Sequence, residues 1–128
     1  MKNILKPLLF VATMLMISSS LSAKSVIEAS DKTFATEIES GYAIVDFWAQ
    51  WCGPCRAFAP TFEALSDEFA GKVKFVKVNV DYAPQTATSF QIRSIPTLIL
   101  FKDGKQIKKW IGSTTKENLR AMINEEIK

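Results

Sequence analysis

The chain has 128 residues with 48% apolar side chains, which is enough to build the core of one domain and too little for two. Its net charge is +3, but two lysines precede residue 24, so the domain expected over residues 24–128 carries 14 of the 16 basic residues against 13 acidic ones. Such a nearly neutral domain is not typical of proteins that bind nucleic acid, and we expect no nucleic-acid partner.

Residues 1–23 have the composition of a secretory signal peptide. The segment begins with lysines, continues with an apolar run from Leu8 to Ile17, ends in small and polar residues, and contains no acidic residue. The apolar run is shorter than the roughly 20 residues of an ordinary membrane span. We expect cleavage after Ala23, or as a second choice after Ser22, and hence export: to the periplasm in a bacterium, otherwise secretion. The alternative is an uncleaved segment that tethers the domain to a membrane.

The domain begins with a short β-like run from Ser25 to Ala29. A helix should follow it, because Phe34 and Ile38 form an apolar pair at helical spacing. Ser30 and Asp31 precede this pair, and their side chains are of the types that cap the first turn of a helix. We therefore expect both residues to begin that helix.

The next run, from Tyr42 to Trp48, is almost continuously apolar, which is typical of a central strand covered on both faces. Asp46 interrupts this run. A carboxylate there is costly to bury in its ionised form, so its pKa should rise and the group should be available to take or give a proton. The alternative is an inward-facing residue satisfied by a hydroxyl group or by water.

Directly after this strand, Trp51-Cys52-Gly53-Pro54-Cys55 contains the only two cysteines of the chain. Two thiols at this spacing can close a disulfide within one helical turn. A helix that begins at Cys52 would aim unpaired N–H groups and the positive end of its dipole at that sulfur. This arrangement lowers the pKa of a thiol and favours Cys52 as the attacking thiolate in disulfide exchange.

Two other interpretations of the cysteine pair are weaker. A structural disulfide that closes so short a loop would stabilise the fold by only about 2 kcal/mol, against about 3 kcal/mol for a loop of about 15 residues. A structural zinc site needs four ligands, and the chain has no histidine and no third cysteine. We therefore expect a redox-active pair and no metal.

The second half of the chain continues this alternation of helices and strands. A helix from Cys52 to about Ala70 carries an apolar stripe on one face and contains Pro60. Lys102-Asp103-Gly104-Lys105 is a hairpin signal, and Thr114 with Glu117 predicts a capping box for a final helix. The remaining strands are expected at Val73–Val80, and at Thr97–Phe101 and Gln106–Ile111 as an antiparallel pair. Pro84–Phe90 has only a weak helical pattern, and a short helix there is expected mainly from the family resemblance given next.

From about Val26 to its end, the sequence resembles the thioredoxin family, whose motifs it contains in the family's order. These motifs are Phe47-Trp48-Ala49-Gln50-Trp51-Cys52-Gly53-Pro54-Cys55-Arg56, Ala59-Pro60, Lys77-Val78-Asn79-Val80-Asp81, Ile95-Pro96-Thr97 and Phe101-Lys102-Asp103-Gly104. The resemblance implies an α/β thioredoxin fold: a five-stranded mixed sheet of strand order 1-3-2-4-5, flanked by four helices.

The resemblance also implies roles for individual residues. Cys55 would resolve the mixed disulfide that Cys52 forms, and Asp46, with Lys77 as its neighbour, would transfer the proton of Cys55. A cis peptide bond is implied before Pro96, where the backbone of the preceding residue pairs with the substrate chain. The surface that receives partners would consist of Trp51, Gly53, Pro54, Ile95, Pro96, Ile111 and Gly112.

The predicted function is therefore thiol–disulfide exchange, in the direction that reduces protein disulfides. No cofactor is needed for this chemistry, but an exported reductase would depend on a membrane-borne electron donor. We expect the mature domain to be a soluble monomer. The alternatives are an exported thiol oxidase or isomerase, which the oxidising compartment would favour, and a redox-silent binding module on the same fold.

Overall fold

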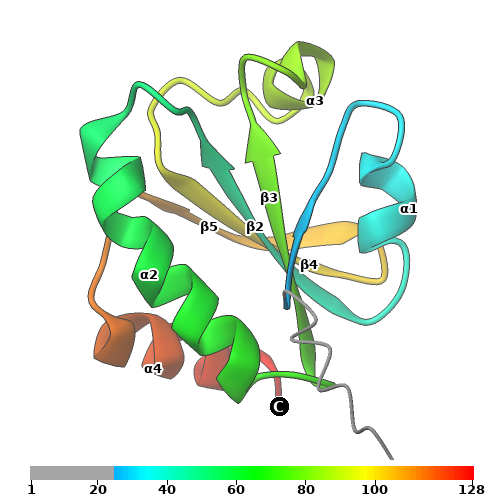
Figure 1. The fold of residues 1–128 in the computed structure, drawn as a ribbon. Helices are drawn as coiled ribbons and strands as arrows, with labels where there is room; N and C mark the ends of the chain where they lie inside the picture. Colours follow the sequence, from blue (N-terminus) through cyan, green and yellow to red (C-terminus); the bar gives the residue numbers. More distant parts are fainter. Residues whose placement is uncertain (1–24) are drawn as a thin grey trace, which may run out of the picture.

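The computed structural model describes residues 25–128; the predicted signal peptide lies outside them. The described part is an α/β unit with helices packed against one mixed sheet (Figure 1). Among its helices, none is long and apolar enough to cross a membrane. The elements are β1 (Val26–Glu28), α1 (Phe34–Ile38), β2 (Tyr42–Trp48), α2 (Gly53–Glu68), β3 (Val73–Asn79), α3 (Pro84–Ser89), β4 (Thr97–Lys102), β5 (Lys105–Ile111) and α4 (Lys116–Glu126).

The sheet has five strands in the order β1-β3-β2-β4-β5, which confirms the predicted topology. β3 pairs in parallel with both β1 and β2, whereas β4 pairs antiparallel with β2 and β5. β2 is thus the central strand, with partners on both edges. The turn between β4 and β5 has positive φ at Asp103 (49°) and Gly104 (80°), the geometry that a two-residue hairpin requires.

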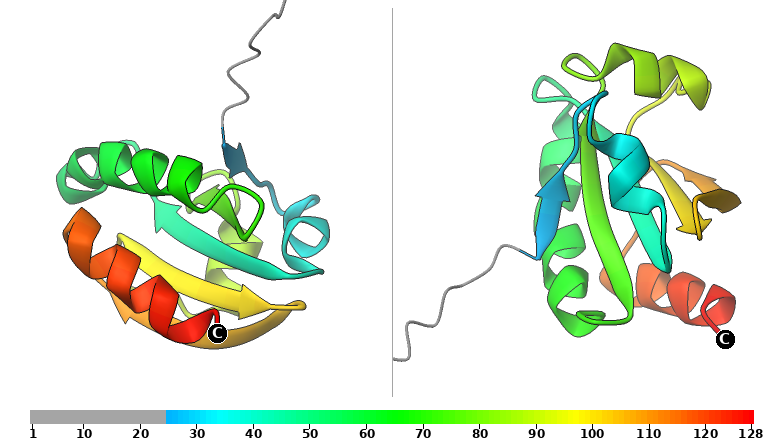
Figure 2. Two further views of the ribbon diagram at one scale, coloured as in Figure 1. Left: turned by 90° about the horizontal axis from the view of Figure 1, so that it is seen from below. Right: turned by 90° about the vertical axis from the view of Figure 1, so that its right-hand side faces the viewer.

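Two apolar cores cover the two faces of the sheet, which explains the unbroken apolar character of β2. Val45 and Phe47 pack on the side of α1 together with Phe34. Ile44 packs on the opposite side with Phe62 of α2, and α4 covers the same side. Figure 2 shows α1 and α2 on opposite sides of the sheet. Because side chains alternate along a strand, Asp46 faces the side of Ile44, beneath α2.

The predicted cap of α1 is wrong. The N-cap residue is Thr33, which makes no side-chain cap hydrogen bond, and Ser30 lies in the turn before the helix, where its hydroxyl accepts a hydrogen bond from the Thr33 backbone N–H at 3.3 Å. Asp31 instead caps a helix far along the chain: its carboxylate accepts hydrogen bonds from the backbone N–H of Thr86 at 2.8 Å and from the Thr86 hydroxyl at 2.7 Å. These bonds also lower the pKa of Asp31. Asp31 therefore joins the loop before α1 to the start of α3.

The predicted cap of the last helix is wrong by one residue. Thr115, not Thr114, is the N-cap of α4, and its hydroxyl accepts a hydrogen bond from the Asn118 backbone N–H at 3.1 Å. Two adjacent threonines offer the same side chain, and the extended backbone of Thr115 (φ −77°, ψ 159°) decides between them. Glu117 consequently lies in the first turn of α4 but not at the capping-box position.

Candidate active site

The two cysteines lie where β2 ends and α2 begins. They form a disulfide, with Cα atoms 5.2 Å apart. Cys52 is the N-cap residue of α2, and its Sγ accepts a hydrogen bond from the Cys55 backbone N–H at 3.2 Å. Pro54 occupies the first turn, where a residue without an N–H group costs no hydrogen bond. The predicted position of Cys52 at the helix N-terminus is therefore confirmed.

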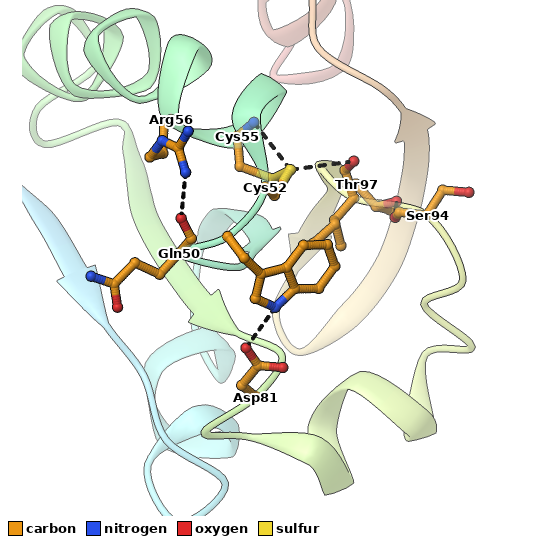
Figure 3. Close-up of a disulfide and its surroundings, with 9 residues drawn as sticks. Gln50, Cys52, Cys55, Arg56, Asp81, Ser94 and Thr97 are labelled. Carbon is orange, nitrogen blue, oxygen red and sulfur yellow. Dashed lines mark hydrogen bonds between the residues drawn. A yellow bond between two sulfur atoms is a disulfide. The ribbon is translucent and has the colours of Figure 1, made fainter.

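This N-terminus favours negative charge on Cys52. The unpaired N–H groups of the first turn and the helix dipole both stabilise an anion at the N-cap. Cys52 is 6% exposed and Cys55 is 2% exposed, so the second sulfur is the more enclosed of the two. Beside them, the guanidinium of Arg56 donates a hydrogen bond to the Gln50 carbonyl at 2.8 Å, which holds the loop before the helix (Figure 3).

A second loop approaches the disulfide from the start of β4. The peptide bond between Ile95 and Pro96 is cis, as predicted. Cys52 Sγ lies 3.8 Å from the Ile95 carbonyl oxygen, and the Gly112 backbone N–H donates a hydrogen bond to the Pro96 carbonyl at 2.8 Å. The structure thus brings Ile95, which is far from Cys52 in the sequence, beside Cys52 Sγ, and Gly112 is hydrogen-bonded to the adjacent Pro96.

Exposed apolar side chains surround the disulfide. Trp51 is 68% exposed and Ile111 is 71% exposed, and Gly53 and Pro54 are exposed beside them. Monomeric proteins seldom leave large apolar side chains in solvent next to a reactive group unless a partner covers them. Trp51, Gly53 and Pro54 are neighbours of the cysteines in the chain, and Ile111 pairs with Thr97, the residue after Pro96; Pro96 itself is buried.

Sequence reasoning missed two residues of this surface. The Trp51 indole N–H donates a hydrogen bond to the Asp81 carboxylate at 2.9 Å (Figure 3), and the next residue, Tyr82, is 78% exposed. Both residues follow β3, whose end lies beside the end of β2. Since ligands of α/β sheets bind at the carboxyl ends of parallel strands, a tyrosine three residues after the end of β3 was a signal that could have found this position.

Asp46 is fully buried beneath this surface. Within residues 25–128, neither of its carboxylate oxygens has a hydrogen-bond partner. Burial, which penalises the charged form, raises its pKa from 3.8 to about 7; the charge of Lys77 opposes this rise and that of Glu28 adds to it. The predicted upward shift is thus confirmed, and the alternative of a carboxylate satisfied by a hydroxyl group finds no such hydroxyl among the described residues.

Lys77 is the cross-strand partner of Asp46, as predicted, but the two do not form an ion pair. Residue 77 of β3 lies directly opposite residue 46 of β2. In the part of the chain that the structure describes, however, the Lys77 ammonium contacts no carboxylate as an ion pair. It lies instead 4.4 Å from the centre of the Trp48 ring, a cation–π contact.

A cysteine pair at a helix N-terminus, closed as a disulfide and bordered by an apolar surface, defines a thiol–disulfide oxidoreductase. A family model described as Thioredoxin matches residues 25–125 of the chain. The chain therefore belongs to the thioredoxin family, and it is a protein-disulfide reductase of the thioredoxin type whose substrates are protein disulfides.

Curated relatives support this assignment. The chain is 43% identical to a thioredoxin of Staphylococcus epidermidis over 103 residues, which cover 80% of this chain and 99% of that protein. Over the same length and shares, it is 44% identical to a thioredoxin of Staphylococcus saprophyticus. It is 42% identical to one of Staphylococcus aureus, again with 80% and 99% coverage.

Proposed function

We propose that Cys52 is the nucleophile and Cys55 the resolving thiol. The Cys52 thiolate attacks one sulfur of a substrate disulfide; a mixed disulfide forms, the substrate bond breaks, and the released substrate thiolate takes up a proton. Cys55 then loses its proton and attacks Cys52 Sγ, which frees the second substrate thiol and leaves the Cys52–Cys55 disulfide. Two electrons pass from the enzyme dithiol to the substrate. The observation that carries this assignment is the hydrogen bond from the Cys55 N–H to Cys52 Sγ at the start of α2.

Asp46 is the proposed acceptor of the Cys55 proton. A general base works best when its pKa lies near the working pH, and burial raises the pKa of Asp46 to about 7. Its oxygens have no hydrogen-bond partner among the described residues, so no protein group in that part of the chain competes with Cys55 for them. Lys77 supplies the nearby positive charge that keeps part of the Asp46 population ionised at neutral pH.

The substrate is held mainly through its backbone. The Ile95 carbonyl lies beside Cys52 Sγ, where a substrate chain that delivers a disulfide to Cys52 would pass. Trp51, Ile111 and Gly112 then cover the flanks of that chain as a flat apolar surface. Recognition of main chain by this surface explains how one enzyme accepts many protein disulfides.

We also propose that the domain works outside the cytoplasm as a monomer. The composition of residues 1–23 supports export, and the family match begins only at residue 25. The relatives align over 103 residues that cover 99% of their length, so the N-terminal segment is an addition to the part they share. Fractionation of cells that express the full chain, with sequencing of the mature N-terminus, tests both export and cleavage after Ala23.

An exported reductase must be reduced again after each turnover. The compartment favours disulfides, so a dithiol donor carried by a membrane system is required to keep Cys52 and Cys55 reduced. Trapping with a Cys55→Ser variant in intact cells should capture this donor as well as the substrates. If the captured proteins include substrates but no membrane protein with a reactive cysteine, the proposed donor is wrong.

The oxidising compartment also favours a second candidate, a thiol oxidase or isomerase. Gly53 and Pro54 supply no side-chain donor or charge to the Cys52 thiolate, so we expect a potential near the thioredoxin value of about −270 mV and far from the roughly −120 mV of a strong oxidant. The redox potential is measured by equilibrating the mature domain with glutathione buffers and following its redox state by tryptophan fluorescence. A potential above about −180 mV would make the protein an oxidant or isomerase.

A further inference from the structure

Three charged side chains lie in one row across the parallel half of the sheet. Glu28 of β1 is the register partner of Lys77 of β3, and Lys77 is in turn the register partner of Asp46 of β2. Register partners in parallel strands point to the same face, so all three lie on the side of the sheet that α2 covers. The row therefore places one positive charge between two negative ones.

In this row, Lys77 lies between two carboxylates that differ in their exposure to solvent. Asp46 is fully buried, whereas Glu28 belongs to an edge strand and is partly open to solvent. Burial raises the pKa of Glu28, while the nearby Trp48 indole and the charge of Lys77 lower it. The Trp48 N–H itself is buried and lies near Glu28 without forming a hydrogen bond of ordinary geometry among the described residues.

The position of the Lys77 ammonium shows that neither carboxylate holds it in an ion pair. It lies over the Trp48 ring, and no ion pair joins it to Asp46 or Glu28 in residues 25–128. Two opposite charges at close range favour the ionised forms of both, so an ion pair with Lys77 would keep Asp46 ionised and make it a weak proton acceptor. The ammonium contacts the Trp48 ring instead, so Asp46 has no such ion pair in the described structure.

We propose that Glu28 is a positioning residue: its attraction for the Lys77 ammonium opposes that of Asp46, so the ammonium stays over the Trp48 ring and Asp46 is left free to accept the proton of Cys55. The inference rests on the proposed role of Asp46 as the base of the resolving step. Glu28 touches neither cysteine; it acts through Lys77 and through its own negative charge. Its place at the edge of the sheet adds a solvent-accessible carboxylate to an otherwise enclosed proton-transfer site.

No other charged group complicates this assignment in the described structure. From β3, Asp46 faces Lys77; from β1, it is influenced by Glu28. Its register partner in β4 is Leu98, which is apolar and buried, and α2 contributes the cysteines. A change in the titration of Asp46 in the disulfide form can therefore be traced to Lys77 or Glu28, because the cysteines do not titrate in that form.

The direct test follows the carboxyl carbon of Asp46 by NMR in the oxidised protein from about pH 4 to about pH 9. In Glu28→Gln, the midpoint should fall by roughly half a pH unit or more, because the repelling charge is lost and Lys77 turns toward Asp46. In the control Glu63→Gln, which removes an exposed carboxylate of α2, the midpoint of Asp46 should not move. An unchanged or raised midpoint in Glu28→Gln would overturn the inference.

A double-mutant cycle tests the part played by Lys77. In a Lys77→Met background, Glu28→Gln should shift the Asp46 midpoint by less than half of its effect in the native background. Equal shifts in both backgrounds would mean that Glu28 acts by repulsion alone, and would overturn the role of Lys77. Glu28→Asp, which keeps the charge, is the variant to use if Glu28→Gln does not fold, and it should retain a midpoint close to the native one.

Kinetics separate this inference from the proposed function. The pH profile of mixed-disulfide resolution should move to lower pH by the same amount as the NMR midpoint in Glu28→Gln. If the NMR midpoint of Asp46 moves but the pH profile of resolution does not, Asp46 is not the base of the resolving step. The proposed function is then wrong in that step, and the positioning role of Glu28 is wrong as well. If neither moves while Asp46→Asn slows resolution, the proposed function stands and the inference fails.

Discussion

The backbone N–H of Cys55 donates a hydrogen bond to the Sγ of Cys52 at 3.2 Å, so the second cysteine helps to stabilise charge on the first. The contact exists because Cys52 is the N-cap of α2 and Cys55 belongs to its first turn. The two thiols consequently differ, although they share one short loop. Cys52 receives the charge-stabilising field of the helix at its sulfur, whereas Cys55 supplies the backbone N–H donor and is almost fully buried.

The first prediction follows from this asymmetry. Cys52→Ser should abolish disulfide exchange, whereas Cys55→Ser should still attack a substrate but stop at the mixed disulfide. Mass spectrometry of each variant after incubation with an insulin substrate distinguishes the two outcomes. In the reduced native protein, iodoacetamide at neutral pH should label Cys52 first; preferential labelling of Cys55 would reverse the assignment.

The second prediction concerns stability and pH in the oxidised protein. The pKa of Asp46 is about 7 in the folded chain against 3.8 for its ordinary value, so the folded state holds the extra proton and the native protein loses stability as pH rises between these values. Asp46→Asn removes this loss. Its free energy of unfolding, relative to the native protein, should increase by up to roughly 4 kcal/mol from about pH 4 to about pH 8.

Urea denaturation across this pH range measures the effect, and Glu63→Gln, which alters an exposed carboxylate, is the control with no such trend. The same Asp46→Asn variant should resolve mixed disulfides more slowly near neutral pH, so stability and rate should change in opposite directions. A pH-independent difference in stability would mean that Asp46 does not titrate near neutrality in the folded protein.

The third prediction assigns a role to Tyr82 in substrate binding. This side chain is 78% exposed and follows Asp81, which holds the Trp51 indole. Tyr82→Ser should raise KM for a protein disulfide about five-fold, the loss of about 1 kcal/mol of contact, with kcat little changed. Tyr82→Phe should keep the native KM because the ring remains. A small disulfide that cannot reach residue 82 should be reduced equally by all three proteins; a general loss of activity would contradict the assignment.

The fourth prediction tests the cap of α4 with a matched pair of threonines. Thr115→Ala removes the hydroxyl that accepts the Asn118 N–H and should cost about 1 kcal/mol of stability. Thr114→Ala removes the same atoms one residue earlier and should cost far less. Thermal unfolding of both variants measures the difference, and equal losses would show that the cap contributes nothing specific.

The sequence by itself determined most of the secondary structure and the identity of the redox pair. These features rest on short-range patterns: the apolar run of β2, the turn signal at Asp103-Gly104, and two cysteines in one helical turn after a strand. Each pattern constrains the backbone locally, because side-chain alternation, turn conformation and capping depend on neighbours within a few residues. Family resemblance supplied the strand order, the helix at Pro84–Phe90 and the cis bond at Pro96, which the residues alone did not predict.

Only the tertiary structure decided which polar groups meet. Asp31 caps α3 rather than the helix next to it, and Glu28 joins Lys77 and Asp46 in a row that no sequence spacing marks. The Lys77 ammonium lies over Trp48 instead of pairing with Asp46. The physical reason is that a charged side chain has several partners of similar strength within reach, and the choice among them depends on burial and register between strands that are far apart in the chain.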